Sequence, residues 1–149
     1  MITERGETAT LSYDASENIL YFTFPHTDGP SGGAWGVRLD TPEQIVAHFD
    51  RCVSFWKRHC AGRKVYCVVD YDGIDVNVKY TKVYATQLQR ILDISVTVVR
   101  YGGSSLQRTA VRLANLKLHT PSQLYASREE ALHVVRSLKS GAMDLASAS

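Results

Sequence analysis

The sequence predicts an α/β domain with a single mixed sheet of about five or six strands and four helices. Residues 65–69 form a continuous apolar run, which is typical of a central strand buried on both faces. From that run onward, strand-like and helix-like segments alternate at the spacing of βα units, which requires parallel strands. Before it, two short strand-like segments joined by a turn predict an antiparallel hairpin.

The amino-terminal part of the chain contains the predicted hairpin. Residues 8–13 and 19–24 are rich in β-branched and aromatic side chains, and residues 14–18 between them have the composition of a turn. Residues 25–33 are dense in turn formers and predict a loop, and residues 35–39 predict a short third strand. We expect this hairpin to contribute only antiparallel strands to the sheet.

The first predicted helix follows residue 40. Thr41 and Gln44 have the spacing of a capping box, Pro42 fits the first helical position, and Gly62 is expected to cap the carboxyl end. Apolar side chains recur on one face of this helix at a spacing of three or four residues. These inward positions are Ile45, Phe49, Cys52 or Val53, and Trp56.

Three more helices and two more strands follow the central strand. The second helix is predicted over about residues 79–92 and the third over about residues 105–117. Residues 94–99 and 122–126 predict strands. The fourth helix begins at a second capping box, Ser127 to Glu130, and ends at Gly141, and its predicted inward residues are Ala131, Leu132, Val135 and Leu138.

Length and composition fit one globular domain. Of the 149 residues, 44% are hydrophobic, and the net charge of +2 is too small for the concentrated basic surface of a nucleic-acid-binding protein. No apolar run reaches the roughly 18 residues that span a bilayer, and the amino terminus lacks a hydrophobic signal segment. We predict a cytoplasmic protein without a membrane span, ordered from about residue 7 to 140, with a flexible tail at residues 141–149.

The cysteines and histidines do not have the spacing of metal ligands. Cys52, Cys60 and Cys67 show no C-x-x-C spacing, and we expect them to be buried, reduced core thiols. The histidines are scattered along the chain without an H-x-x-x-H pair, so we predict no metal site. These histidines are His26, His48, His59, His119 and His133.

Three local features share a family pattern. The central strand ends in Val68-Val69-Asp70 with Gly73 after it, residues 96–99 lead to Gly102-Gly103, and residues 125–132 read Tyr-Ala-Ser-Arg-Glu-Glu-Ala-Leu. With the order of segments over about residues 8–139, these features resemble the STAS domain, the fold of bacterial anti-sigma-factor antagonists and of sulphate-transporter tails. They equally resemble a related lipid-binding branch with the same layout. The resemblance implies a STAS-like regulatory scaffold that binds proteins or small ligands and is not catalytic.

One departure from the family concerns its phosphorylation site. The family's regulatory antagonists carry Asp-Ser-Ser-Gly at the start of the helix after the central strand, where a kinase modifies a serine. The matching stretch here is residues 75–81, which contains neither serine nor glycine. Thr81 is its only hydroxyl besides tyrosine, so we do not expect a switch of that kind. The sequence leaves open whether Thr81 or Ser104 is modified.

The favoured function is therefore that of a non-enzymatic module that binds a partner protein, including a second copy of the chain. The binding surface is expected at the loop-side edge of the sheet, near residues 71–80 and 101–112. The predicted partner-binding residues are Tyr71, Asp72, Asp75, Asn77, Tyr80 and Thr81.

The alternative is a domain that binds a small anionic ligand or a lipid, in a pocket between the second and third helices. The Gly102-Gly103 loop joins a strand to a helix start, where backbone amides can hold an anion, and Arg108 adds charge. The same loop can be a plain glycine turn with a serine cap and solvated arginines. The predicted ligand-binding residues are Gly102, Gly103, Ser104, Ser105, Arg108 and Arg112.

The third possibility is an enzyme that uses Asp70 and Asp72 around Mg²⁺, in the manner of haloacid-dehalogenase-type phosphatases. The carboxylates have a simpler structural use, because Asp72-Gly73 forms a turn and Asp75 can cap the next helix. Such phosphatases also need an acidic pair after a later strand, and none follows Val99. We therefore predict no catalytic residue and no cofactor.

Overall fold

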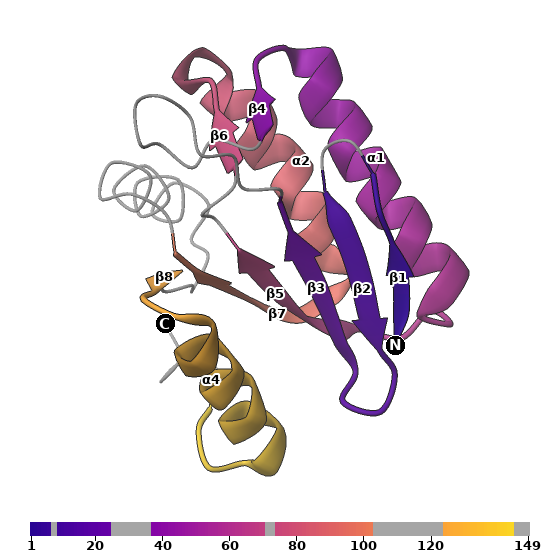
Figure 1. The fold of residues 1–149 in the computed structure, drawn as a ribbon, viewed down its shortest axis with the longest axis vertical. Helices are drawn as coiled ribbons and strands as arrows, with labels where there is room; N and C mark the ends of the chain where they lie inside the picture. Colours follow the sequence, from indigo (N-terminus) through magenta and orange to yellow (C-terminus); the bar gives the residue numbers. More distant parts are fainter. Residues whose placement is uncertain (7–8, 25–36, 71–73, 103–123, 145–149) are drawn as a thin grey trace.

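The structure, a computed structural model, describes residues 1–6, 9–24, 37–70, 74–102 and 124–144. A six-stranded mixed sheet has the order β1-β2-β3-β5-β7-β8, and β4 and β6 form a separate two-stranded sheet (Figure 1). The strands are Ile2–Glu4 (β1), Thr10–Asp14 (β2), Ile19–Thr23 (β3), Val37–Leu39 (β4), Val65–Asp70 (β5), Ile74–Val76 (β6), Ser95–Tyr101 (β7) and Leu124–Tyr125 (β8). The helices are Pro42–His59 (α1), Thr81–Asp93 (α2) and Arg128–Ser140 (α4), with a 3₁₀ turn at Val78–Tyr80 (η1).

The main sheet joins an antiparallel part to a parallel part, which confirms the predicted α/β class and mixed sheet. β1 pairs with β2 and β2 with β3 in antiparallel register. β3 pairs with β5, β5 with β7 and β7 with β8 in parallel register. The expectation that the hairpin contributes only antiparallel strands is wrong for β3. The other edge of β3 pairs in parallel with β5. This is possible because α1, which lies between β3 and β5 in the sequence, carries the chain back across the sheet.

Four other expectations need correction or lie outside the described residues. The ordered region begins before residue 7, because β1 already pairs with β2. The strand predicted at residues 35–39 exists as β4, but it pairs with β6 and does not join the main sheet. The helix predicted at residues 105–117 lies outside the described residues, and so do residues 145–149 of the tail.

The capping box of α1 forms as predicted. The Thr41 hydroxyl accepts a hydrogen bond from the Gln44 amide at 3.2 Å, and the Gln44 side chain accepts one from the Thr41 amide at 3.2 Å. The expected cap at Gly62 is wrong, because the helix ends at His59 and the Cys60 amide donates to the Trp56 carbonyl at 2.9 Å. The chain leaves the helix through the left-handed residues Ala61 and Gly62, with φ of 52° and 72°.

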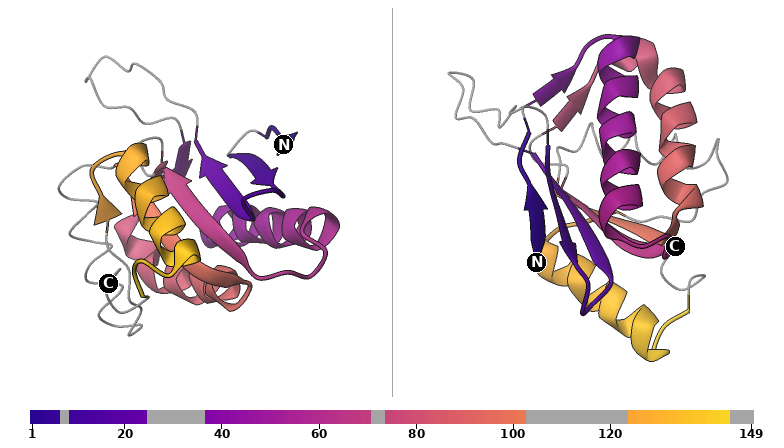
Figure 2. Two further views of the ribbon diagram at one scale, coloured as in Figure 1. Left: turned by 90° about the horizontal axis from the view of Figure 1, so that it is seen from below. Right: turned by 90° about the vertical axis from the view of Figure 1, so that its right-hand side faces the viewer.

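Helices cover both faces of the main sheet (Figure 2). α1 and α2 lie on one face, over a core that includes Leu11, Leu20, Val65 and Val98. α4 lies on the other face, over the second core cluster. The buried members of that cluster are Ile19, Tyr21, Val68, Val99, Tyr101, Ala131, Val134 and Val135. β5 contributes side chains to both clusters, which confirms its prediction as a central strand buried on both faces.

α4 is fixed at both ends and tied to the hairpin. The Ser127 hydroxyl accepts from the Glu130 amide at 3.2 Å, and Gly141 ends the helix with φ of 78°, both as predicted. The Arg136 guanidinium donates to the Glu17 carboxylate at 3.1 and 3.3 Å, across the turn between β2 and β3. This ion pair holds the carboxyl-terminal helix against the amino-terminal hairpin.

Arg51 of α1 binds the backbone of the amino-terminal segment. Its guanidinium donates to the Ala9 carbonyl at 2.5 Å, to the Glu4 carbonyl at 3.2 Å and to the Glu4 carboxylate at 3.2 Å. Arg58 donates to the same carboxylate at 2.7 Å and thereby lowers the pKa of Glu4. A Cβ atom at Gly6 would lie 2.4 Å from the Arg51 guanidinium. Gly6 therefore leaves the space that this guanidinium occupies.

We expect Gly6→Ala to lower the free energy of unfolding by about 1–2 kcal/mol, because the guanidinium must give up part of its charge-assisted hydrogen bonding. In an Arg51→Met background, which keeps most of the apolar stem, the same substitution should cost much less. Urea denaturation of the four proteins in this cycle measures the coupling. An equal cost in both backgrounds would show that the penalty arises from the backbone at residue 6 and not from contact with Arg51.

Candidate functional site

The predicted anion loop is described only at Gly102. This residue follows β7 with φ of 79°, and its amide donates to the Tyr125 carbonyl at 3.0 Å. The amide is therefore used to connect β7 to β8. The other predicted ligand-binding residues lie outside the described residues, namely Gly103, Ser104, Ser105, Arg108 and Arg112.

The predicted partner-binding residues have different surroundings. Asn77 supports the turn before α2, because its amide donates to the Leu39 carbonyl at 3.0 Å and its side chain accepts from the Lys79 amide at 3.1 Å. Tyr80 packs partly buried against the first core cluster, whereas Thr81 is exposed at the start of α2. Asp75 lies on β6, and Tyr71 and Asp72 lie outside the described residues.

Of the two proposed metal carboxylates, Asp70 alone belongs to the part of the chain that the structure describes. Asp70 is buried at the end of β5, in register with Tyr101 of β7, and Asp72 lies outside the described residues. Among the described residues, no group of three His, Cys, Asp or Glu side chains is arranged to hold a metal ion.

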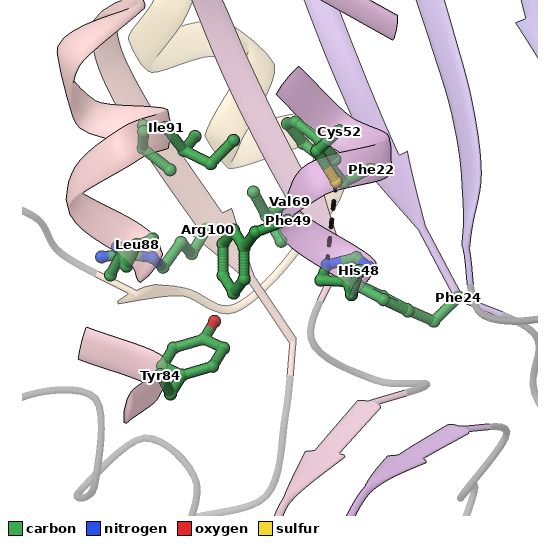
Figure 3. Close-up of a pocket in the computed structure, with 11 residues that line it drawn as sticks. Phe22, Phe24, His48, Phe49, Cys52, Val69, Tyr84, Leu88, Ile91 and Arg100 are labelled. Atoms are coloured by element: carbon green, nitrogen blue, oxygen red, sulfur yellow. Dashed lines mark hydrogen bonds between the residues drawn. The ribbon is translucent and has the colours of Figure 1, made fainter. Parts of the chain in front are cut away.

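A cavity that the sequence did not predict lies between the main sheet and the helices α1 and α2 (Figure 3). Its volume is about 30 Å³, and most of its lining is aliphatic or aromatic. The lining residues are Phe22, Phe24, His48, Phe49, Cys52, Val69, Tyr84, Leu88, Ile91, Val98 and Arg100. This volume suits a water molecule or the end group of a ligand, since sites that enclose a whole drug-sized ligand measure roughly 300–1,000 Å³.

Secondary-structure periodicity brings these residues together. On α1, His48 and Cys52 are four residues apart and therefore share a face, as Tyr84 and Leu88 do on α2. Arg100 is two residues from Val98 on β7, so both side chains point to the helices. The predicted strand ended at Val99, which placed Arg100 in a loop. Extending the strand alternation by one residue would have predicted the inward direction of this arginine.

His48 is a buried imidazole with incomplete hydrogen bonding. It is 6% exposed, its Nε2 lies 3.8 Å from the Cys52 sulfur, and its Nδ1 has no hydrogen-bond partner among the described residues. Leaving one buried polar atom unpaired costs about 1–3 kcal/mol. Burial, and secondarily the charge of Arg51, lowers the pKa of His48 to about 4. The imidazole is therefore neutral at pH 7.

The thiol beside His48 is protonated as well. Burial raises the pKa of Cys52 to about 12, and it raises that of Cys60 to about 11 and that of Cys67 to about 12. All three cysteines are buried and free, as predicted. Nucleophilic cysteine sites need a thiolate, which a neighbouring imidazolium stabilises. The His48–Cys52 pair has the opposite protonation and is suited to hydrogen bonding.

Arg100 supplies the positive charge of the cavity lining. Its side chain is 1% exposed, and a guanidinium stays protonated even when buried. Figure 3 shows Arg100 and His48 reaching the cavity from different elements, β7 and α1. The cavity therefore combines mostly apolar walls with the charged group of Arg100 and the polar groups of His48, Cys52 and Tyr84.

Comparisons with known proteins do not assign the chain to a family. No protein-family model matches it, and neither curated proteins nor solved structures give a significant match. The resemblance to STAS domains therefore stays a prediction from the sequence. No helix within the described ranges is long and apolar enough to cross a bilayer.

Proposed function

We propose that this domain is a non-enzymatic binding module that takes the end of a small ligand into the cavity between the main sheet, α1 and α2. The observation that carries the proposal is the presence of two buried polar side chains, His48 and Arg100, in a mostly apolar cavity. Ligand sites are typically apolar and contain a few convergent polar groups. The protonated Cys52 thiol and the neutral His48 support binding over nucleophilic chemistry.

The alternative is the STAS-like scaffold role, with a partner protein or a second copy bound near residues 71–80 and 101–112. The exposed Thr81 at the start of α2 is the described residue that favours it. Protein-binding surfaces usually present an exposed apolar patch. Among the described residues, the large exposed hydrophobic side chains are Met1, Ile2 and Val96, which are outside that predicted surface. Residues 71–73 and 103–112 of that surface lie outside the described residues, so experiment must distinguish the two functions.

Val98→Ile tests the proposal by filling the cavity. The added methyl group takes up space beside Arg100, so we expect the affinity for a ligand carried by the purified protein to fall at least about tenfold, equivalent to about 1.4 kcal/mol. Native mass spectrometry of the protein purified from cells, compared with its denatured mass, measures ligand retention. The wild-type chain should carry extra mass that is lost on denaturation.

Val99→Ile is the matched control, because Val99 is the next residue of β7 and packs in the α4-side core cluster. The same methyl group there changes packing without entering the cavity, so ligand retention should stay at the wild-type level. Equal retention by Val98→Ile and Val99→Ile would place the ligand elsewhere. A wild-type chain that is bare, and that binds no added small molecule, would contradict the proposed function and favour the scaffold role.

A further inference from the structure

The imidazole of His48 has one ring nitrogen without a hydrogen bond at the wall of the cavity. The side chain is 6% exposed and lines the cavity, and its Nδ1 has no hydrogen-bond partner among the described residues. Two aromatic rings hold the imidazole in place, since the ring centroids of Phe24 and Phe49 lie 5.6 and 5.1 Å from its own. Because a buried polar atom without a partner lowers stability, a ligand that bonds this nitrogen would remove that cost.

The other ring nitrogen determines whether Nδ1 donates or accepts. Nε2 lies 3.8 Å from the Cys52 sulfur, and the thiol there keeps its proton. When the thiol donates to Nε2, the imidazole proton is on Nδ1, and when Nε2 donates to the sulfur, Nδ1 is an acceptor. A ligand group that suits both tautomers must donate as well as accept. A hydroxyl group does so with a single oxygen atom.

The rest of the lining favours a hydroxyl group over larger or charged polar groups. An amide would bring both a carbonyl and an amino group into the cavity, and only one of them could bond Nδ1. A carboxylate or an ammonium group would need a counter-charge, and the neutral His48 supplies none. Arg100, the charged side chain among the described lining residues, already interacts with another group of the protein. Recognition of the end group therefore depends on His48 and not on Arg100.

The size and the walls of the cavity define the part of the ligand next to the hydroxyl group. A volume of about 30 Å³ is enough for a hydroxyl group and the carbon beside it, because one water molecule needs roughly 10–15 Å³ of such volume. Phe22, Phe24 and Phe49 supply aromatic walls, and aliphatic side chains such as Leu88 and Ile91 add to them. These walls suit an apolar carbon next to the hydroxyl group.

We infer that, if the domain binds a small ligand here as proposed above, the ligand is an uncharged alcohol with an apolar body, and its hydroxyl group bonds Nδ1 of His48. The hydroxyl group accepts from Nδ1 in one tautomer of the imidazole and donates to it in the other. The carbon that bears the hydroxyl group contacts the aromatic walls. The site is therefore selective for alcohols over isomeric ethers, which present a terminal methyl group to Nδ1, and over acids and amines, which are charged at pH 7.

The test compares alcohols with isomeric ethers on the full chain. The probes are benzyl alcohol with its isomer anisole, and hexanol with its isomer methyl pentyl ether. Titrations followed by nitrogen NMR at pH 7 measure both the affinity and the chemical shifts of the two His48 ring nitrogens. We expect at least one alcohol to bind about fivefold more tightly than its ether, as one net hydrogen bond allows, and to shift Nδ1 more than Nε2. The shift is measured on the wild-type chain and needs no variant.

Two variants locate the preference for the alcohol. His48→Phe keeps an aromatic ring in the wall and removes Nδ1, so the alcohol and its isomeric ether should bind about equally. The shifts of the backbone amides of α1 measure binding to this variant. Val99→Ile, on the other face of the sheet, should leave the preference of the wild type unchanged.

The outcomes separate this inference from the proposed function. Ethers, hexanoate or hexylamine that bind as tightly as the alcohols would overturn the inference and leave ligand binding intact. If no probe binds, any ligand released from the purified protein is identified by its mass and composition. A released uncharged alcohol whose retention depends on His48 supports the inference, and any other released ligand overturns it. A bare chain that binds no probe, with water alone in the cavity, overturns both the inference and the proposed function.

Discussion

Replacing Phe55 with alanine is expected to lower the free energy of unfolding by about 3–5 kcal/mol. Phe55 is 0% exposed and lies in the core cluster between α1 and the main sheet. Its ring also packs against the His59 ring, with centroids 4.7 Å apart. Alanine loses the transfer free energy of the ring and leaves a cavity that the sheet side cannot fill. Since domains of this size are stable by about 5–15 kcal/mol, the loss is a large fraction of the total.

Urea denaturation followed by circular dichroism measures this change as a lower midpoint at an unchanged slope. Ser54→Ala is the matched control, because Ser54 precedes Phe55 on the same helix and is exposed. Its effect should stay within about 0.5 kcal/mol. A loss below about 1 kcal/mol for Phe55→Ala would contradict the packing of α1 on the sheet through this residue.

Phe55 also shows how far helical periodicity predicts a packing face. The spacing of apolar residues predicts Trp56 as the inward residue of the last turns, and the structure buries Phe55 there instead. Trp56 is partly buried at the edge of the cluster, and its indole donates to the Arg63 carbonyl at 2.8 Å. An indole with one polar atom suits such an edge, whereas a phenyl ring has no polar atom to satisfy. Local start signals such as the Thr41 capping box were predictable because they depend on adjacent residues.

Pairing between distant segments was less predictable. The sequence indicated the hairpin of β2 and β3 and the central strand β5, because each has its own apolar pattern. It did not indicate that β3 lies beside β5 in parallel register, or that Ile2–Glu4 adds an edge strand. These pairings depend on the path of α1 and on the contacts of Arg51 with the amino-terminal backbone.

The candidate site was missed for a related reason. His48 and Arg100 are 52 positions apart, and neither belongs to a motif. On α1, His48 occupies an inward position of an otherwise apolar face, and Arg100 extends the β7 alternation beyond the predicted strand end. The sequence offered one indication of this site, namely a polar residue at an inward position of α1 and another at an inward position of β7. Their meeting in one cavity depends on how α1 packs beside α2 and on the contact of α2 with β7.

Acid destabilisation through His48 is the second large effect that we expect. The folded pKa of His48 is about 4, lowered by burial from 6.5, so above pH 6.5 the imidazole is neutral in both the folded and the unfolded chain. As the pH falls from 6.5 towards 4, the unfolded chain takes up a proton that the folded chain does not. The unfolded state then binds more protons, and stability decreases. The full contribution is about 3 kcal/mol, lost by the time the pH has fallen to the folded pKa.

His48→Phe removes this contribution, so its stability should fall less between pH 7 and pH 4, by up to about 3 kcal/mol. Urea denaturation at half-unit pH steps measures both proteins. Acidic groups with lowered pKa values, such as Glu4 and Asp14, also lose stabilising interactions in acid, but they are common to both proteins and cancel in the difference. His133→Gln, an exposed position on α4, controls for removal of a histidine and should follow the wild-type profile.

The interpretation of these pH profiles depends on the groups that surround His48. Arg51 and Cys52 lie near it on α1, Arg100 lines the same cavity from β7, and Tyr84 lines it from α2. Nearby positive charge and burial both oppose protonation, so the two causes act in the same direction. Parallel pH profiles for wild type and His48→Phe would mean that the imidazole protonates as readily in the folded as in the unfolded chain. That result would contradict a neutral His48 in the cavity.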